Sequence, residues 1–95
     1  MESVPSRDEI GLRIKEIIGR VAGLDPTRIG DQATLREDLN LDSLSLLEIS
    51  VDVDLAFKLE LADERYKEID SLPAMVALVE DRLRELAVQP EAVQG

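Results

Sequence analysis

The stretch Asp42–Leu59, DSLSLLEISVDVDLAFKL, carries the signals of two different secondary structures. Apolar and polar residues alternate strictly from Ile49 to Leu55, which is the period of a half-buried strand. The segment Ser43–Leu59 is nevertheless too long for a typical strand, contains no turn residue and begins with a cap-like Asp-Ser pair. We therefore predict a helix over about Ser43–Leu59, and a strand is the alternative.

This helix has two apolar faces when its residues are placed at about 100° intervals. One is an ordinary core face made of Leu46, Ile49, Ser50, Val53 and Phe57. The other, called the second face below, consists of Leu44, Leu47, Val51 and Leu55. One helix of a small domain can hardly bury its whole circumference, so we predict that the second face is partly exposed and docks a partner, with Ser43 at its edge. The alternative is that Leu44 and Leu55 pack under a neighbouring loop.

A first helix is predicted over about Arg7–Ala22. Ser6 and Glu9 have the spacing of a capping box, and isoleucines follow at helical intervals. The connection over residues 23–42 is rich in turn residues and has no single period. Its aliphatic residues should pin it to the core, and these are Ile29, Leu35, Leu39 and Leu41.

Two further helices are predicted in the last third of the chain. A short one covers about Asp63–Lys67, and a longer one follows the cap-like pair Asp70-Ser71. Pro73 falls in the first turn of the longer helix, where its missing N–H costs nothing. The buried stripe of that helix should be Leu72, Val76, Val79, Leu83 and Leu86. The expected fold is therefore all-α, a small four-helix bundle with a long first loop and a short third helix.

The composition excludes several function classes. The chain has 95 residues, enough for one small domain, and it contains no Cys and no His. Asp52 and Asp54 lack the pattern of a calcium loop, so we predict no metal site. No apolar run approaches membrane-spanning length and the N-terminus has no signal-peptide pattern, so we expect a cytoplasmic protein without membrane insertion. The net charge of -10 disfavours nucleic acid as a partner.

The negative charge is concentrated in the middle of the chain. From Glu37 to Glu64 there are nine acidic residues and a single base, Lys58. Such a segment attracts a basic partner toward Ser43, and the attraction weakens as salt rises. A basic protein surface is therefore the expected counterpart of this region.

Ser43 has three possible roles, as a nucleophile, a helix cap or an attachment point. Without His a Ser-His-Asp triad is excluded, and none of the three lysines lies near Ser43 in the sequence, so we predict that the chain is not an enzyme. The cap is expected of Asp42. An exposed hydroxyl at a helix N-terminus suits a phosphate ester, in which case another protein carries out the chemistry on Ser43.

The triplet Asp42-Ser43-Leu44 and its surroundings resemble the acyl carrier proteins. Leu35–Leu39, LREDL, precedes the triplet as in the family pattern x-x-E-D-L-G-x-D-S-L, and Glu48-Ile49 follows like the family's V-E-L. The similarity extends through Phe57–Leu61 and spans about Arg7 to Leu86. Three positions depart from the usual pattern, which has Gly, an acid and Pro where this chain has Asn40, Ser45 and Ala62.

The resemblance implies that Ser43 receives 4'-phosphopantetheine from coenzyme A through a phosphopantetheinyl transferase. The thiol of that group would carry acyl chains as thioesters. The implied partners are the transferase and acyl-processing enzymes with basic docking patches. The implied recognition residues are Asp42, Leu44, Leu47, Glu48, Val51 and Asp54.

We therefore expect a stand-alone, monomeric acyl carrier protein of fatty-acid or related lipid biosynthesis. The carrier domain would cover residues 7–87, between a flexible N-terminus at 1–6 and a disordered tail at 88–95. One alternative is a specialised polyketide or aminoacyl carrier. Another is an acidic protein-interaction adaptor in which Ser43 is only a helix cap.

Overall fold

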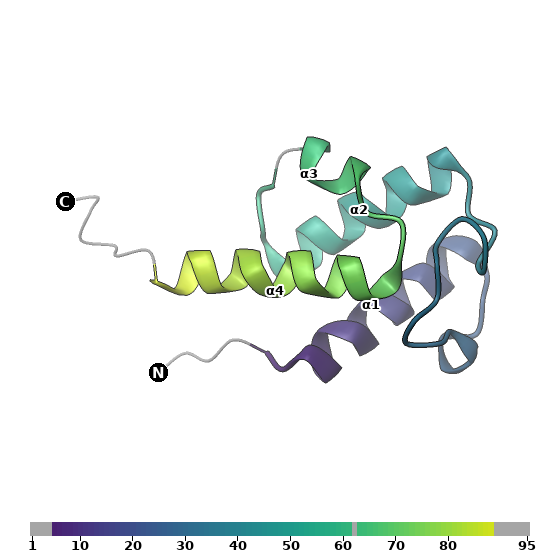
Figure 1. The fold of residues 1–95 in the computed structure, drawn as a ribbon, viewed down its shortest axis with the longest axis horizontal. Coiled ribbons are helices and arrows are strands. Elements are labelled where there is room, and N and C mark those ends of the chain that lie inside the picture. Colours follow the sequence, from purple (N-terminus) through teal and green to yellow (C-terminus); the bar gives the residue numbers. More distant parts are fainter. Residues whose placement is uncertain (1–4, 62, 89–95) are drawn as a thin grey trace.

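The computed structural model describes residues 5–61 and 63–88, and within them the fold is built from helices. These are α1 (Arg7–Ala22), the 3-10 turn η1 (Pro26–Arg28), α2 (Ser43–Phe57), α3 (Asp63–Lys67) and α4 (Leu72–Val88). In Figure 1, α1 lies below α4, and α2 and α3 lie above it. The predicted all-α bundle with a long first loop and a short third helix is confirmed.

α1 begins with the capping box that the sequence predicts. The backbone N–H of Glu9 donates to Ser6 Oγ (3.2 Å), and the N–H of Ser6 donates to Glu9 Oε1 (3.3 Å). The helical domain therefore includes Ser6, one residue more than predicted. The helix ends at Gly23, whose φ of 74° is left-handed and whose N–H donates to Gly19 O.

α2 is a helix, so the strand alternative is wrong. It ends at Phe57, before the predicted end at Leu59, because Lys58 takes a left-handed conformation with φ 55°. The N–H of Lys58 donates to Asp54 O and closes the last turn. Leu59 is fully buried, but it packs into the core from outside the helix.

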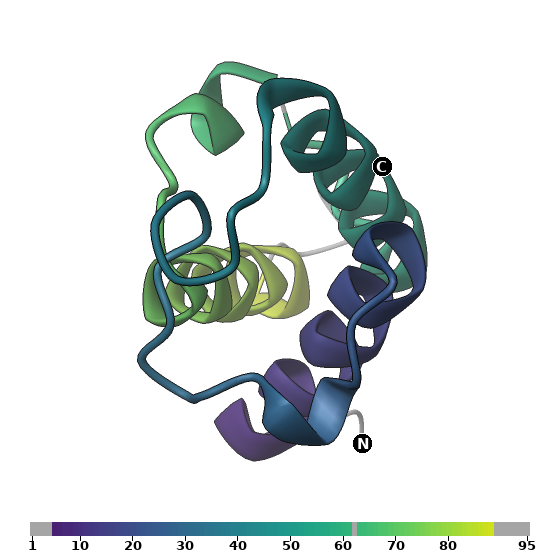
Figure 2. The same ribbon diagram turned by 90° about the vertical axis from the view of Figure 1, so that its right-hand side faces the viewer.

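The 23–42 connection crosses the N-terminal end of α4, as Figure 2 shows. Thr34 and Ser71 form an isolated antiparallel bridge, and the N–H of Leu35 donates to Asp70 O at 2.9 Å. Leu39 is half-buried, and the other three predicted anchors are buried, namely Ile29, Leu35 and Leu41. The connection is therefore pinned to the core as predicted.

The core is aliphatic and centred on α1, which contacts both α2 and α4. In the predicted stripe of α4, Leu83 and Leu86 are half-buried, and the remaining residues are buried: Leu72, Val76 and Val79. Met75 and Leu78 are buried too, which the sequence analysis does not predict. Met75 faces the side of α4 toward α2 and α3, so α4 is covered over a wider arc than one stripe.

The described residues end within α4 at Val88 and begin at residue 5. Val88 is still helical, so α4 is longer than the predicted domain by one residue. The predicted disordered tail otherwise lies outside the described residues, as does most of the predicted flexible N-terminus. Within the part of the chain that the structure describes, no helix is both long enough and apolar enough to cross a bilayer.

Candidate functional site

Ser43 is the first residue of α2, and its side chain is exposed. The cap of this helix is made by Asp42, whose carboxylate accepts the N–H of Ser45 at 2.8 Å. The prediction that Asp42 rather than Ser43 caps the helix is therefore confirmed. Ser43 is therefore not needed as the cap, which is the only role that the adaptor alternative gives it.

The cap also fixes the charge next to Ser43. Hydrogen bonds from the backbone and side chain of Ser45 lower the pKa of Asp42 below its ordinary value of 3.8. Asp42 is therefore ionised at neutral pH. The carboxylate of Asp42, the residue before Ser43, therefore carries a negative charge at the edge of the surface that a partner of Ser43 would cover.

The second face is exposed along the whole of α2. The exposed fractions are 64% for Leu44, 52% for Leu47, 47% for Val51 and 69% for Leu55. The alternative that Leu44 and Leu55 pack under a loop is wrong, because these two are the most exposed of the four. The core face behaves as expected, with Ile49 and Val53 fully buried. α2 thus presents an unpartnered apolar surface that begins at Ser43.

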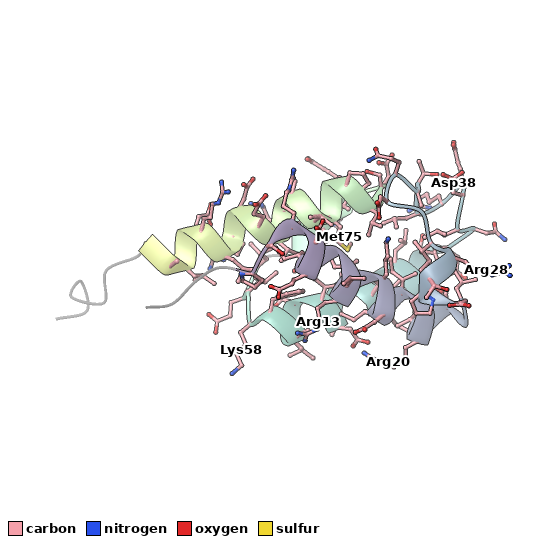
Figure 3. All side chains as sticks on the ribbon, turned by 90° about the horizontal axis from the view of Figure 1, so that it is seen from below. Arg13, Arg20, Arg28, Asp38, Lys58 and Met75 are labelled. Atoms are coloured by element: carbon pink, nitrogen blue, oxygen red, sulfur yellow. The ribbon has the colours of Figure 1, made fainter. Side chains whose placement is uncertain are left out.

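The acidic residues of α2 differ in how free their charges are. Glu48 is exposed among the second-face leucines. Asp52 lies 3.5 Å from a guanidinium nitrogen of Arg20 on α1, and Arg13 of the same helix sits over the ring of Phe57. Figure 3 shows both arginines on the α1 side of the molecule. Glu48 is therefore the acid of α2 that is best placed to meet a partner on the second face.

Asp54, which the resemblance assigns to the recognition residues, is directed inward instead of toward solvent. Its carboxylate accepts the N–H groups of Glu60 and Leu61 and the hydroxyl of Tyr66, all at 3.0 Å. This carboxylate therefore organises the α2–α3 connection. Its part in recognition stays a prediction, and the geometry gives it a structural role that the sequence analysis does not anticipate.

A cavity of about 320 Å³ opens beside Ser43, between α2 and α3. Its lining is mainly apolar and comes from α2, from α3 and Ile69 beyond it, from the long connection and from Met75 of α4. The residues that matter below are Ser43, Leu46, Leu47, Tyr66, Ile69 and Met75. The sequence analysis misses this cavity. The one available signal is Tyr66, an aromatic residue on a helix too short to need one for its own core.

At this site Ser43 can accept a chemical group that another protein transfers to it. The chain has no His, and among the described residues no group of three His, Cys, Asp or Glu side chains could hold a metal ion. What the structure brings together is an exposed hydroxyl, an ionised cap, an apolar surface and a cavity. These features suit a residue that is modified by another protein and then presented to further ones.

Comparisons with known proteins match this chain to acyl carrier proteins and to the phosphopantetheine attachment site that they contain. Residues 12–79 match the family described as "Phosphopantetheine attachment site". The acyl carrier protein of Rubrobacter xylanophilus is 36% identical over 73 residues, which cover 77% of this chain and 90% of that one. The meromycolate extension acyl carrier protein of Mycobacterium tuberculosis is 32% identical over 90 residues, which cover 95% of this chain and 76% of that one.

The fold is also similar to that of an acyl carrier protein whose structure has been solved. A structure of the acyl carrier protein from Enterococcus faecalis matches with a TM-score of 0.66 and 26% identity. The match covers 82% of this chain and 99% of that one. Sequence and fold comparisons therefore agree with each other and with the arrangement around Ser43.

Proposed function

The chain belongs to the acyl carrier proteins, the family of the phosphopantetheine attachment site, and from that premise we propose that Ser43 bears the 4'-phosphopantetheine group. This family carries acyl groups in lipid biosynthesis, and its cofactor is 4'-phosphopantetheine. When attached, the group supplies a terminal thiol that holds acyl chains as thioesters. The observation that carries the assignment to Ser43 is its exposed hydroxyl on the first residue of α2, with the cap bond made by Asp42.

The residues at this position fit the group. A phosphodiester on Ser43 Oγ would lie at the N-terminal end of a 15-residue helix, whose backbone N–H groups favour negative charge. Ser43 is exposed, so its hydroxyl can be reached from solvent. The absence of Cys from the chain fits as well, because the working thiol arrives with the prosthetic group.

The attachment itself requires a second protein, a phosphopantetheinyl transferase. Ser43 Oγ attacks the pantetheine-side phosphorus of coenzyme A and forms a phosphodiester, while the pyrophosphate bond breaks and adenosine 3',5'-bisphosphate leaves. The serine proton must go to a base, and this chain has no His to supply one. The base therefore belongs to the transferase, and this chain acts as its substrate.

The second face is the surface on which the transferase and acyl-processing enzymes would dock. Its four aliphatic side chains are exposed and begin next to Ser43, so a partner that covers them brings its active site to the hydroxyl. The acidic excess from Glu37 to Glu64 favours partners with basic patches. Glu48 and Asp42 supply exposed negative charge on and beside this face.

The cavity between α2 and α3 supports an acyl cargo. Most of its lining surface is apolar, and Ser43 is one of its lining residues, within reach of a flexible arm that folds back. The acyl carrier proteins that match this chain include one named for meromycolate extension, which favours fatty-acid or related lipid cargo over aminoacyl cargo. A monomeric state and a cytoplasmic location stay predictions.

The proposal is tested by incubating the protein with coenzyme A and a promiscuous phosphopantetheinyl transferase, followed by intact-mass measurement. The wild type should gain one phosphopantetheine group and Ser43→Ala should gain none. Ser45→Ala is the matched control, since it removes a hydroxyl two residues away, keeps the backbone N–H that Asp42 caps, and should be modified like the wild type. Modification of Ser43→Ala, or no modification of the wild type, would overturn the assignment.

A further inference from the structure

One carboxylate, that of Asp54, joins three elements that are separate in the sequence. It sits near the end of α2, accepts two backbone N–H groups from the connection to α3, and accepts the Tyr66 hydroxyl from α3 itself. Hydrogen bonds to an ionised acceptor are stronger than those between neutral groups. Asp54 therefore fixes the position of α3 relative to α2.

α3 is too short to be stable without links to the rest of the fold. It has five residues, Asp63–Lys67, far fewer than a helix needs for stability of its own. The extensive helix contacts among the described residues join α1 to α2 and to α4, and do not include α3. The hydrogen bond from Tyr66 to Asp54 is one restraint on this helix, and the burial of the Tyr66 ring is another.

Tyr66 is also a wall of the cavity beside Ser43. The α2 side of the cavity includes Leu46 and Leu47, and the α3 side includes Tyr66 and Ile69. Tyr66 is only 9% exposed, and its ring is the largest side chain in the lining. The same residue therefore forms part of the cavity wall and, through its hydroxyl, links α3 to α2.

We propose that Tyr66, held by Asp54, sets the length of acyl chain that the cavity accepts. The ring limits how far a chain can enter, and the hydroxyl restrains α3 from moving away from α2. This inference rests on the proposed function, because the cargo reaches the cavity only from a group attached to Ser43. It assigns Tyr66 to cargo selection and gives it no part in the attachment reaction.

The proposal predicts how protection of the cargo varies with its length. Each methylene that leaves water for the cavity should favour the enclosed state about fourfold. Protection of the thioester should therefore rise with chain length until the cavity is full, and then stay level. Tyr66→Ala should shift that level region to longer chains, because it removes a ring from the lining and enlarges the cavity. Tyr66→Phe keeps the ring and should lower protection about twofold to tenfold at every length, because it removes one hydrogen bond.

The experiment loads saturated acyl chains of stepwise length from acyl-coenzyme A onto the wild type, Tyr66→Ala and Tyr66→Phe, using a promiscuous transferase. Intact mass confirms the loading, and the rate of thioester cleavage by hydroxylamine is then measured for each chain length. Arg65→Ala is the matched control, since Arg65 is an exposed α3 residue that does not line the cavity. Circular dichroism checks the helical content of each variant. If Tyr66→Ala loses its helical signal, Tyr66→Leu replaces it, because a shorter apolar side chain also lengthens the cavity.

The outcomes separate this inference from the proposed function. A shifted level region in Tyr66→Ala, uniformly lower protection in Tyr66→Phe and a wild-type profile in Arg65→Ala would support the role of Tyr66. Identical profiles in all loaded proteins would overturn it while the attachment to Ser43 stands. A wild type that takes up no acyl-phosphopantetheine would instead overturn the proposed function, and this inference with it.

Discussion

Replacing Leu44 by Ala should weaken the attachment reaction while leaving the fold intact. Leu44 is 64% exposed, so a partner that covers it removes about that fraction of its surface from water. Full burial of a leucine side chain is worth about 1.5–3 kcal/mol, which makes the loss on docking about 1–2 kcal/mol. At about 1.4 kcal/mol per factor of ten, kcat/KM of the transferase for the carrier should fall roughly 5-fold to 30-fold.

The stability of the Leu44→Ala variant should change little. The side chain contributes little burial in the free protein, and Ala is the best helix former, so the helix itself loses nothing. Leu12 offers a matched control, because it is a leucine on another helix, α1, with a similar exposed fraction of 58%. Leu12→Ala removes the same atoms from a surface outside the second face.

The assay measures initial rates of modification at carrier concentrations well below KM, with apo protein, coenzyme A and transferase, and follows the reaction by intact mass. Thermal unfolding of the same samples confirms that each variant is folded. We expect Leu12→Ala to react within about twofold of the wild type, since its surface substitution lies away from the docking face. If Leu44→Ala reacts as fast as Leu12→Ala, the second face is not the docking surface and the reasoning from exposure fails.

Three further predictions concern stability, pH and salt. Gly19→Ala should destabilise the fold by about 1–3 kcal/mol in urea unfolding, because the added Cβ would lie 2.6 Å from Leu24 O. Gly11→Ala is the control, because its added Cβ would have its nearest contact at 3.9 Å, and it should stabilise the fold by up to about 1 kcal/mol. Equal stability of the two variants would contradict the packing argument. The pKa of Asp42 in the folded protein lies below its ordinary value of 3.8, so its charged cap stabilises the fold fully above pH 3.8, and this contribution is lost as pH falls through the lower folded pKa. Asp42→Asn should therefore lose less stability than the wild type over this acid range. Parallel curves of unfolding free energy against pH for the two proteins would refute the linkage. Glu48→Lys should slow transferase turnover and flatten the dependence of that turnover on salt. Glu16→Lys makes the same charge change at an exposed position of α1 and should do neither. Identical salt slopes in the two variants would show that only the net charge of the protein matters.

Sequence reasoning succeeded where the signal is local. The capping box at Ser6 and Glu9 gives α1 its start, and the bounds of α3 follow from a short polar segment between breaks. The helical period of α2 separates its two faces, and the exposed fractions bear out that separation. Ser43 can be singled out for the same reason, because its place at the start of a helix depends on its immediate neighbours alone.

It could not supply contacts between residues that are distant in the sequence. The carboxylate of Asp54 accepts two N–H groups of the connection and the hydroxyl of Tyr66, twelve residues away, and no local pattern indicates these bonds. The sequence also predicts too late an end for α2, because apolar Leu59 continues the pattern. Only the packed core shows that Leu59 is buried from outside the helix.

The sequence by itself determined that this chain is a small helical acyl carrier with a serine at the start of an amphipathic second helix. Helix caps and the helical period involve residues that are only a few positions apart, so they can be recognised in the sequence without a structure. The tertiary structure alone decided that a cavity opens beside Ser43, that Tyr66 walls it and that Asp54 is turned inward. Those features depend on how a five-residue helix settles against α2, and that placement results from contacts across the fold that no local pattern encodes.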